Sequence, residues 1–73
     1  MNELGKFLKE RRLELALSQK MLAEQIGITS ITLWKIEKGK QIGSSTIRKL
    51  SKYLNIRTRD IRNLMLMKNE NNE

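Results

Sequence analysis

Two short segments of helical periodicity, separated by a single glycine, constrain this chain more than any other feature. Residues 18–39 read SQKMLAEQIGITSITLWKIEKG, with Gly27 between the two segments and Gly39 at the end of the second. Glycine favours the left-handed conformation that ends many helices, and Ser18 and Thr29 are preferred N-cap residues. We therefore predict two helices joined by a tight turn at Gly27.

The second of these segments would form a helix with two contrasting faces. At about 100° per residue, Leu33 and Ile36 point to one side of it. Ile31, Lys35 and Lys38 point to the opposite side, which is therefore basic and partly apolar. An outer face of this kind suits a helix, residues 30–38, that lies in the major groove of double-stranded DNA.

The charge of the chain is concentrated in its second half. Fifteen Lys and Arg residues against eight Asp and Glu residues give a net charge of +7 over 73 residues. Residues 35–62 contain nine basic and two acidic residues, so this segment alone accounts for the whole excess. A basic half is typical of a protein that binds a polyanion, although a surface that only aids solubility would also have one.

The remaining segments predict three more helices in one all-α domain. Apolar residues recur at helical spacing over residues 4–15, 45–54 and 58–68, and the chain has no proline to interrupt them. Residues 1–68 would form a single domain, and residues 69–73, NENNE, would be a polar tail that frays.

Local signals predict where these three helices begin and end. In the first, Leu15 would belong to the inward face with the leucines before it. Ser44 or Ser45 would cap the second, and Asn55 would close it. Thr58 would cap the last helix.

Composition argues against several classes of function. The chain has no Cys and no His, which removes disulfides, thiolate metal sites and the commonest catalytic base. We therefore expect no enzyme activity, no metal and no cofactor. The N-terminus MNELGKFLKE is charged and amphipathic, unlike a signal peptide, and no apolar run approaches the roughly 20 residues of a membrane span. These features predict a cytoplasmic protein with no membrane partner.

The residues around Gly27 resemble a known family, the Cro and phage-repressor class of helix-turn-helix proteins, also called the xenobiotic-response-element family. The resemblance covers about residues 4–61. It rests on the spacing of Gln19, Leu22, Ala23, Gly27, Leu33, Ile36, Glu37 and Gly39. It implies a five-helix, lambda-repressor-like fold and a homodimer that binds a near-palindromic operator. Such proteins regulate transcription, more commonly as repressors.

The resemblance also implies roles for individual residues. Base edges would be contacted by Thr29, Ser30, Ile31 and Lys35. Phosphates would be contacted by Gln19, Thr32, Lys38 and Lys40, and a structural ion pair would join Arg12 and Glu37. The loop after Lys40 reads QIGSS, which is less basic than in many family members, so fewer phosphate contacts are expected from it.

Three outward residues admit more than one interpretation. Lys35 suits either the acceptor atoms of guanine or a phosphate, and Ile31 suits either a thymine methyl group or packing on the neighbouring turn. Trp34 is the only tryptophan. It would lie along the DNA backbone with its indole N–H on a phosphate, or it would pack on a loop or a partner subunit.

The last helix is more apolar than one buried face requires. Its apolar residues are Ile61, Leu64, Met65, Leu66 and Met67. We interpret the excess as a dimerisation surface, with simple exposure as the alternative. A second interpretation is an antitoxin-type module that binds a partner protein through this helix and binds DNA for autoregulation. RNA binding is less favoured, because the sequence has no paired aromatic platform for bases.

Overall fold

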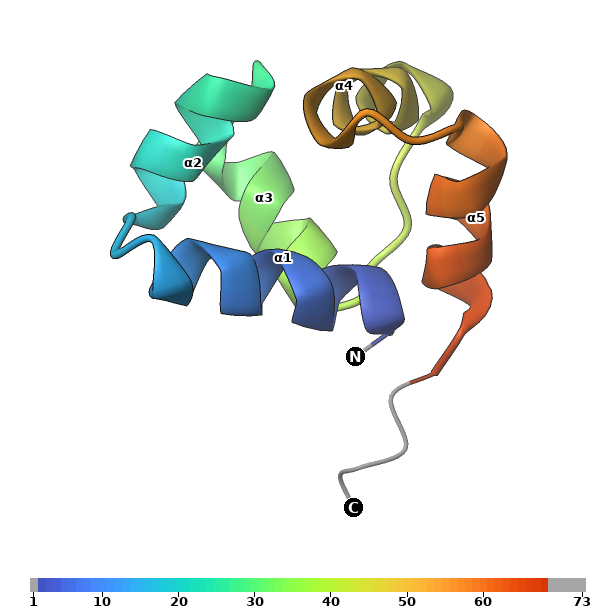
Figure 1. Ribbon diagram of the computed structural model, residues 1–73, viewed down its shortest axis with the longest axis horizontal. Coiled ribbons are helices and arrows are strands. Elements are labelled where there is room, and N and C mark those ends of the chain that lie inside the picture. The colour runs from blue at the N-terminus through green and yellow to red at the C-terminus, as the bar shows by residue number, and fades with distance from the viewer. Residues whose placement is uncertain (1, 69–73) are drawn as a thin grey trace.

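The computed structural model describes residues 2–68, which form five helices joined by short connections (Figure 1). The helices are α1 (Glu3–Glu14), α2 (Gln19–Ile26), α3 (Ser30–Glu37), α4 (Ser44–Leu54) and α5 (Thr58–Leu66). The predicted all-α class with five helices is confirmed. The tail that was expected to fray, residues 69–73, lies outside the described residues.

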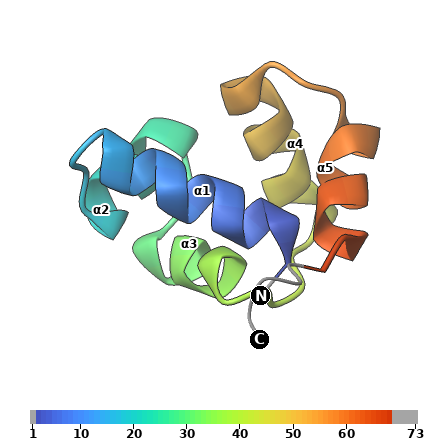
Figure 2. The same cartoon turned by 60° about the horizontal axis from the view of Figure 1, so that its bottom comes forward.

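Each helix packs on two others, and the packed pairs close a ring around the core. α1 packs on α3 and α5, α2 packs on α3 and α4, and α4 packs on α5. In Figure 1, α1 runs along the lower edge, α2 and α3 lie at the left and centre, and α4 and α5 close the right-hand side. Figure 2 brings α1 to the front and shows α3 beside it. One side of α3 therefore faces into the ring and the other faces outward.

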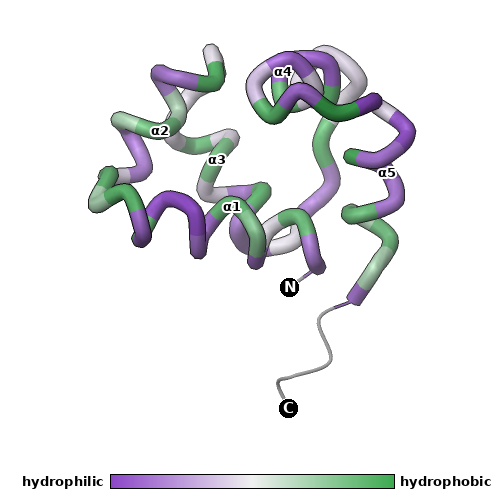
Figure 3. The backbone as a smooth tube through the Cα atoms, in the orientation of Figure 1, coloured by the Kyte–Doolittle hydropathy of each residue, from purple (hydrophilic) through white to green (hydrophobic). Residues whose placement is uncertain are grey.

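The core consists of aliphatic side chains from all five helices. The buried set is Leu4, Leu8, Leu22, Ala23, Ile26, Leu33, Ile36, Ile47, Leu50 and Ile61. Hydrophobic and hydrophilic residues alternate along the helices in Figure 3, as expected when one side of each helix is buried. The prediction that Leu15 joins this set is wrong. α1 ends at Glu14, so the helical spacing stops before Leu15, which is exposed.

The ends of α2 and α3 follow the local signals in the sequence. The Ser18 hydroxyl accepts a hydrogen bond from the backbone N–H of Met21 at 3.1 Å. The Thr29 hydroxyl accepts one from the backbone N–H of Thr32, also at 3.1 Å. Gly27 ends α2 with a φ of 92°, in the left-handed region that favours glycine. The two predicted N-caps and the predicted turn are therefore confirmed.

The predicted N-caps of α4 and α5 are wrong. Gly43 is the N-cap of α4, so Ser44 and the serine after it are already helical. Arg57 is the N-cap of α5, and Thr58 is its first helical residue. Neither glycine nor a guanidinium offers a side-chain oxygen, so these two helices begin without a side-chain acceptor at the N-cap. The end of α4 is as predicted, because Asn55 closes it with a φ of 58°.

α1 and α3 approach each other most closely at Gly5. A Cβ atom placed on Gly5 would lie 2.5 Å from the carbonyl oxygen of Ile36 and 3.1 Å from that of Glu37. Both neighbours are backbone atoms, which cannot rotate away as a flexible side chain would. Gly5 therefore sets how near the start of α1 lies to the end of α3.

Gly5→Ala should lower the free energy of unfolding by about 1–3 kcal/mol, because its methyl group must push α1 away from α3. Gly43→Ala is a matched control, since nothing lies within 4 Å of a Cβ added there. The control should lose only the preference for glycine over alanine at an N-cap, about 0.5 kcal/mol. Urea denaturation followed by circular dichroism measures both. Equal losses in the two variants would contradict the close approach.

Candidate nucleic-acid interface

The outward side of α3 carries the residues that its helical periodicity placed there. Leu33 and Ile36 are buried in the core, whereas Ile31 is 67% exposed. Lys35 and Lys38 are exposed on the same side as Ile31. The predicted division of this helix into an inner apolar face and an outer basic face is confirmed.

The four residues predicted to contact bases lie together at the start and centre of α3. Thr29, Ser30, Ile31 and Lys35 are all exposed. The Thr29 hydroxyl is already engaged, because it accepts from the Thr32 N–H and donates to the Thr32 hydroxyl at 2.9 Å. Thr29 therefore has an acceptor position left but no proton to donate. The Thr32 hydroxyl keeps its own proton, which suits a phosphate oxygen as acceptor.

Trp34 lies outside the core, at one edge of the outer face of α3. It is 42% exposed. The ammonium nitrogens of Lys38 and Lys40 each lie 5.9 Å from the centroid of its ring. A cation over an indole at an exposed site contributes about 0.5–1 kcal/mol. The ring thus lies beside the loop that follows α3. The two lysines next to it are both predicted to contact phosphates.

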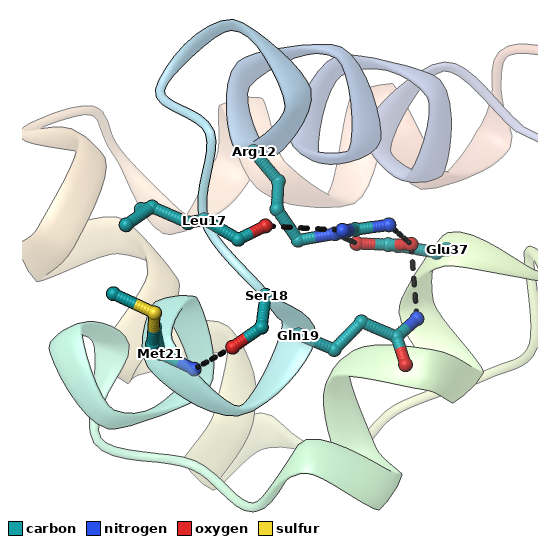
Figure 4. Close-up of polar contacts among 6 residues, drawn as sticks. All are labelled: Arg12, Leu17, Ser18, Gln19, Met21 and Glu37. Atoms are coloured by element: carbon teal, nitrogen blue, oxygen red, sulfur yellow. Dashed lines mark hydrogen bonds and ion pairs between the residues drawn. The ribbon is translucent and has the colours of Figure 1, made fainter.

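An ion pair between the partly buried Arg12 and the buried Glu37 holds α3 against α1 (Figure 4). Arg12 Nε donates to Glu37 Oε2 at 2.8 Å, and its terminal nitrogen Nη2 donates to Glu37 Oε1 at 3.2 Å. Arg12 Nη1 donates to the carbonyl oxygen of Leu17 at 3.1 Å. Gln19 Nε2 donates to Glu37 Oε1 at 3.1 Å from the other side. The Glu37 carboxylate therefore joins α3 to both α1 and α2.

The environment of Arg12 favours the charged form of its side chain. The hydrogen bond to Glu37 raises the pKa of Arg12 above its ordinary value, and the opposite charge of Glu37 adds to this, while burial works against it. Because the folded-state pKa is raised, the stability that this group contributes is present at all pH values below the ordinary pKa of arginine and is lost only above the raised pKa. The guanidinium therefore remains charged at any pH at which the protein would function.

Gln19 makes a hydrogen bond inside the domain, in addition to the phosphate contact predicted for it. Its amide nitrogen donates to the buried Glu37, so part of its hydrogen-bonding capacity serves the ion pair. Its side chain also lines an open hollow together with Ser30, Ile31 and Trp34. This hollow, which we call the apolar hollow, opens on the outer face of α3.

A match over most of the chain now identifies the family. Residues 8–61 match the family model described as helix-turn-helix. This chain belongs to the helix-turn-helix family. The family is one of DNA-binding rather than catalytic domains, of the Cro and xenobiotic-response-element type, so DNA binding is the function class of this domain. A search of curated proteins found no match, and a search of solved structures found none either.

None of the helices in residues 2–68 is both long and apolar enough to cross a membrane. Over the same residues, no three His, Cys, Asp or Glu side chains gather in a way that could hold a metal ion.

The apolar residues of α5 divide into two groups. Ile61 is fully buried in the core, so its assignment to a dimerisation surface is wrong. Leu64 and Met65 are partly buried and pack against the same core. Leu66 is 80% exposed and Met67 is 52% exposed. The end of α5, and not its inner face, is the part that is open to a partner.

Two features of this helix-turn-helix domain were not predicted from the sequence. One is a cluster in which the Arg11 guanidinium lies 5.6 Å from the centroid of the Tyr53 ring, and the Tyr53 hydroxyl donates to Gln25 Oε1 at 3.3 Å. This cluster joins α1, α4 and α2. The other is Lys9, which lines a polar hollow beside the buried ion pair. Both depend on how α1 crosses the other helices, and residue spacing within one segment does not reveal that crossing.

Removing both charges of the Arg12–Glu37 pair should destabilise the domain less than the sum of the two single removals. Arg12→Met or Glu37→Met leaves the other charge buried without its partner, and each should lower the free energy of unfolding by about 3 kcal/mol. The double variant should lose clearly less than the sum of the two, because two methionines can pack where the pair was. Urea denaturation of the four proteins gives the coupling energy. Additive losses would contradict a paired, buried interaction.

Proposed function

We propose that this domain is a sequence-specific regulator of transcription that inserts α3 into the major groove of double-stranded DNA. The observation that carries the proposal is the outer face of α3. Ser30, Ile31 and Lys35 are exposed there, on a helix anchored behind by Leu33 and Ile36. Recognition in the major groove requires such a rigid helix with side chains free to reach base edges.

Base recognition would rest on one polar, one apolar and one charged side chain. Lys35 lies at the centre of the exposed face and would donate to the O6 and N7 acceptors of guanine. Ile31 is 67% exposed and borders the apolar hollow, which suits contact with the methyl group of thymine. Ser30 and the remaining acceptor position of Thr29 would add hydrogen bonds to neighbouring bases.

Phosphate contacts would supply much of the affinity from the rim of the same face. The candidates are Gln19, Thr32, Trp34, Lys38 and Lys40. The last three already lie together, with both ammonium groups beside the indole ring. Each phosphate neutralised by a cation adds about 0.9 to the slope of log affinity against log salt.

A homodimer would place two copies of α3 in successive major grooves, about 34 Å apart, on a near-palindromic operator. Leu66 is exposed at the end of α5, beside an open hollow that Ile42 and Met65 also line. A two-fold interface uses the same patch on both subunits, so each Leu66 would enter the hollow of the other. Repression by blocking a promoter is the proposed outcome, and the cytoplasm, where the operator would lie, is the proposed location.

The exposed end of α5 is also compatible with a protein partner of another kind. The exposed Leu66 and Met67 would equally suit an apolar patch on a different protein, as in an antitoxin-type module. In that case DNA binding would serve autoregulation. We rank this second, because nothing about the patch favours a foreign surface over a second copy of the chain.

Selection of bound duplexes from a random-sequence pool tests the main proposal. We expect an inverted repeat with half-sites one helical turn apart, and with a thymine whose replacement by uracil weakens wild-type binding. Lys35→Ala should relax the preference at one base pair in each half-site, and Ile31→Ala should abolish the sensitivity to uracil. Binding with no enriched motif, lost uniformly as salt rises, would contradict sequence-specific recognition.

Leu66→Glu should convert a wild-type dimer into a monomer, because it places a charge at the centre of the proposed interface without disturbing the core. Leu13→Glu on α1 is the matched control, since Leu13 is also a largely exposed leucine. Sedimentation equilibrium distinguishes the two states. A monomeric wild-type protein, or a Leu66→Glu variant that still dimerises, would refute this interface.

A further inference from the structure

A groove lies between the end of α2 and the second half of α4, and we call it the α2–α4 groove. It is lined by Gln25, Ile26, Gly27, Lys49, Lys52 and Tyr53. In Figure 2, α3 lies below α1, whereas the later part of α4 lies above it. A duplex that contacts the outer face of α3 would therefore leave this groove accessible.

The groove combines an apolar floor with a basic rim. Ile26 is only 6% exposed, and the half-buried Tyr53 packs against the core, so these two side chains form the floor. Lys49 and Lys52 are exposed and lie three residues apart on α4, which places them on the same side of the helix. A Cβ atom added to Gly27 would meet nothing within 4 Å, so the groove stays open at the turn after α2.

Tyr53 is held in place by two neighbouring helices. Its hydroxyl donates to Gln25 Oε1 at 3.3 Å and accepts from Arg11 Nε at 3.5 Å. The Arg11 guanidinium also lies 5.6 Å from the centroid of the ring. A side chain that is ordered before a partner arrives costs less conformational entropy on binding than one that must first be immobilised. The apolar floor is therefore preorganised.

The lysines of the groove have no ionic partner in the domain. The Arg12–Glu37 pair is the one ion pair found within residues 2–68, and none of the residues that line the groove is acidic. Two lysines at this spacing on a helix repel each other, so they lower the stability of α4 slightly when nothing compensates them. Carboxylates placed between them would remove this repulsion.

We propose that the α2–α4 groove binds an acidic segment of a partner protein. An apolar side chain of that segment would lie on Ile26 and Tyr53, and carboxylates on either side of it would pair with Lys49 and Lys52. A nucleic-acid backbone would supply the anions but no aliphatic side chain for the floor. The inference goes beyond the proposed function and does not depend on which DNA sequence α3 would recognise. It implies that DNA and the partner bind at the same time.

Fluorescence anisotropy with a short labelled peptide of alternating glutamate and leucine tests this site. A matched peptide carries glutamine in place of glutamate. The wild-type protein should bind the glutamate peptide and not the glutamine peptide. Lys49→Gln and Lys52→Gln should each weaken binding about two- to fivefold, as expected for the loss of one exposed ion pair, and the double variant about tenfold.

The double variant Arg48→Gln, Arg59→Gln is the matched control. It removes two charges from exposed positions of α4 and α5 that do not line the groove, so it should bind the glutamate peptide almost as the wild type does. Thermal melts confirm that all variants fold. An equal loss in the control would mean that the peptide responds only to net charge, and this would overturn the site. So would a wild-type protein that does not bind the glutamate peptide.

Nuclear magnetic resonance locates the bound peptide. The amide signals of Gly27, Lys49 and Lys52 should shift when the glutamate peptide is added, whereas those of Ser30 and Ile31 should not, and a saturating duplex should not displace the peptide. Shifts at Ser30 and Ile31, with displacement by the duplex, would place the peptide on the outer face of α3 and overturn the proposal. Displacement by free glutamate at the same carboxylate concentration would assign the groove to small carboxylates and overturn the protein partner.

Discussion

The Arg12–Glu37 pair is the interaction on which the position of α3, and with it the outer face of this helix, depends. It is the one ion pair found within residues 2–68, and Glu37 is the only charged residue among those that are buried there. Taking both groups out of water costs free energy that the pair recovers only with good geometry and further hydrogen bonds. Leu17 and Gln19 supply these bonds. An apolar contact has no preferred direction, whereas this network links α1, α2 and α3 through directional hydrogen bonds.

α3 is held in place by its buried side chains Leu33 and Ile36 and by the hydrogen bonds of Glu37. Its outer face is therefore not needed for the packing of the helices. Ile31 and Trp34 are large apolar side chains that a domain of this size gains little by exposing. A second molecule that binds to this face would bury both side chains, which would account for their exposure in the free domain. Trp34 is the pivotal residue, because it borders the apolar hollow and the polar hollow beside the ion pair and lies next to two lysines. Under the proposed function, rigid support and an exposed apolar ring would together allow this surface to discriminate among bases.

What the sequence predicted well was local. The caps at Ser18 and Thr29 and the turn at Gly27 each depend on one residue and the backbone next to it. The starts of α4 and α5 were less predictable, because a serine or threonine caps a helix only if its own backbone is extended. Ser44 and Thr58 are instead already helical, and Gly43 and Arg57 before them are extended. Apolar spacing placed Ile61 on a helix face but could not tell the core from a subunit interface.

Contacts between distant segments could not be predicted either, because residue spacing within one segment does not show how the helices cross. One such contact has a consequence for a dimer. The backbone N–H of Glu3, at the start of α1, donates to the carbonyl oxygen of Met67 at 2.8 Å, so the end of α5 is tied to α1. α1 is in turn held against α3 by the close approach at Gly5 and by the buried ion pair. In a dimer joined through Leu66, the interface would therefore connect to each recognition helix through one short, rigid path. The separation of the two half-sites would then be set by the packing of α1 and not by a flexible linker.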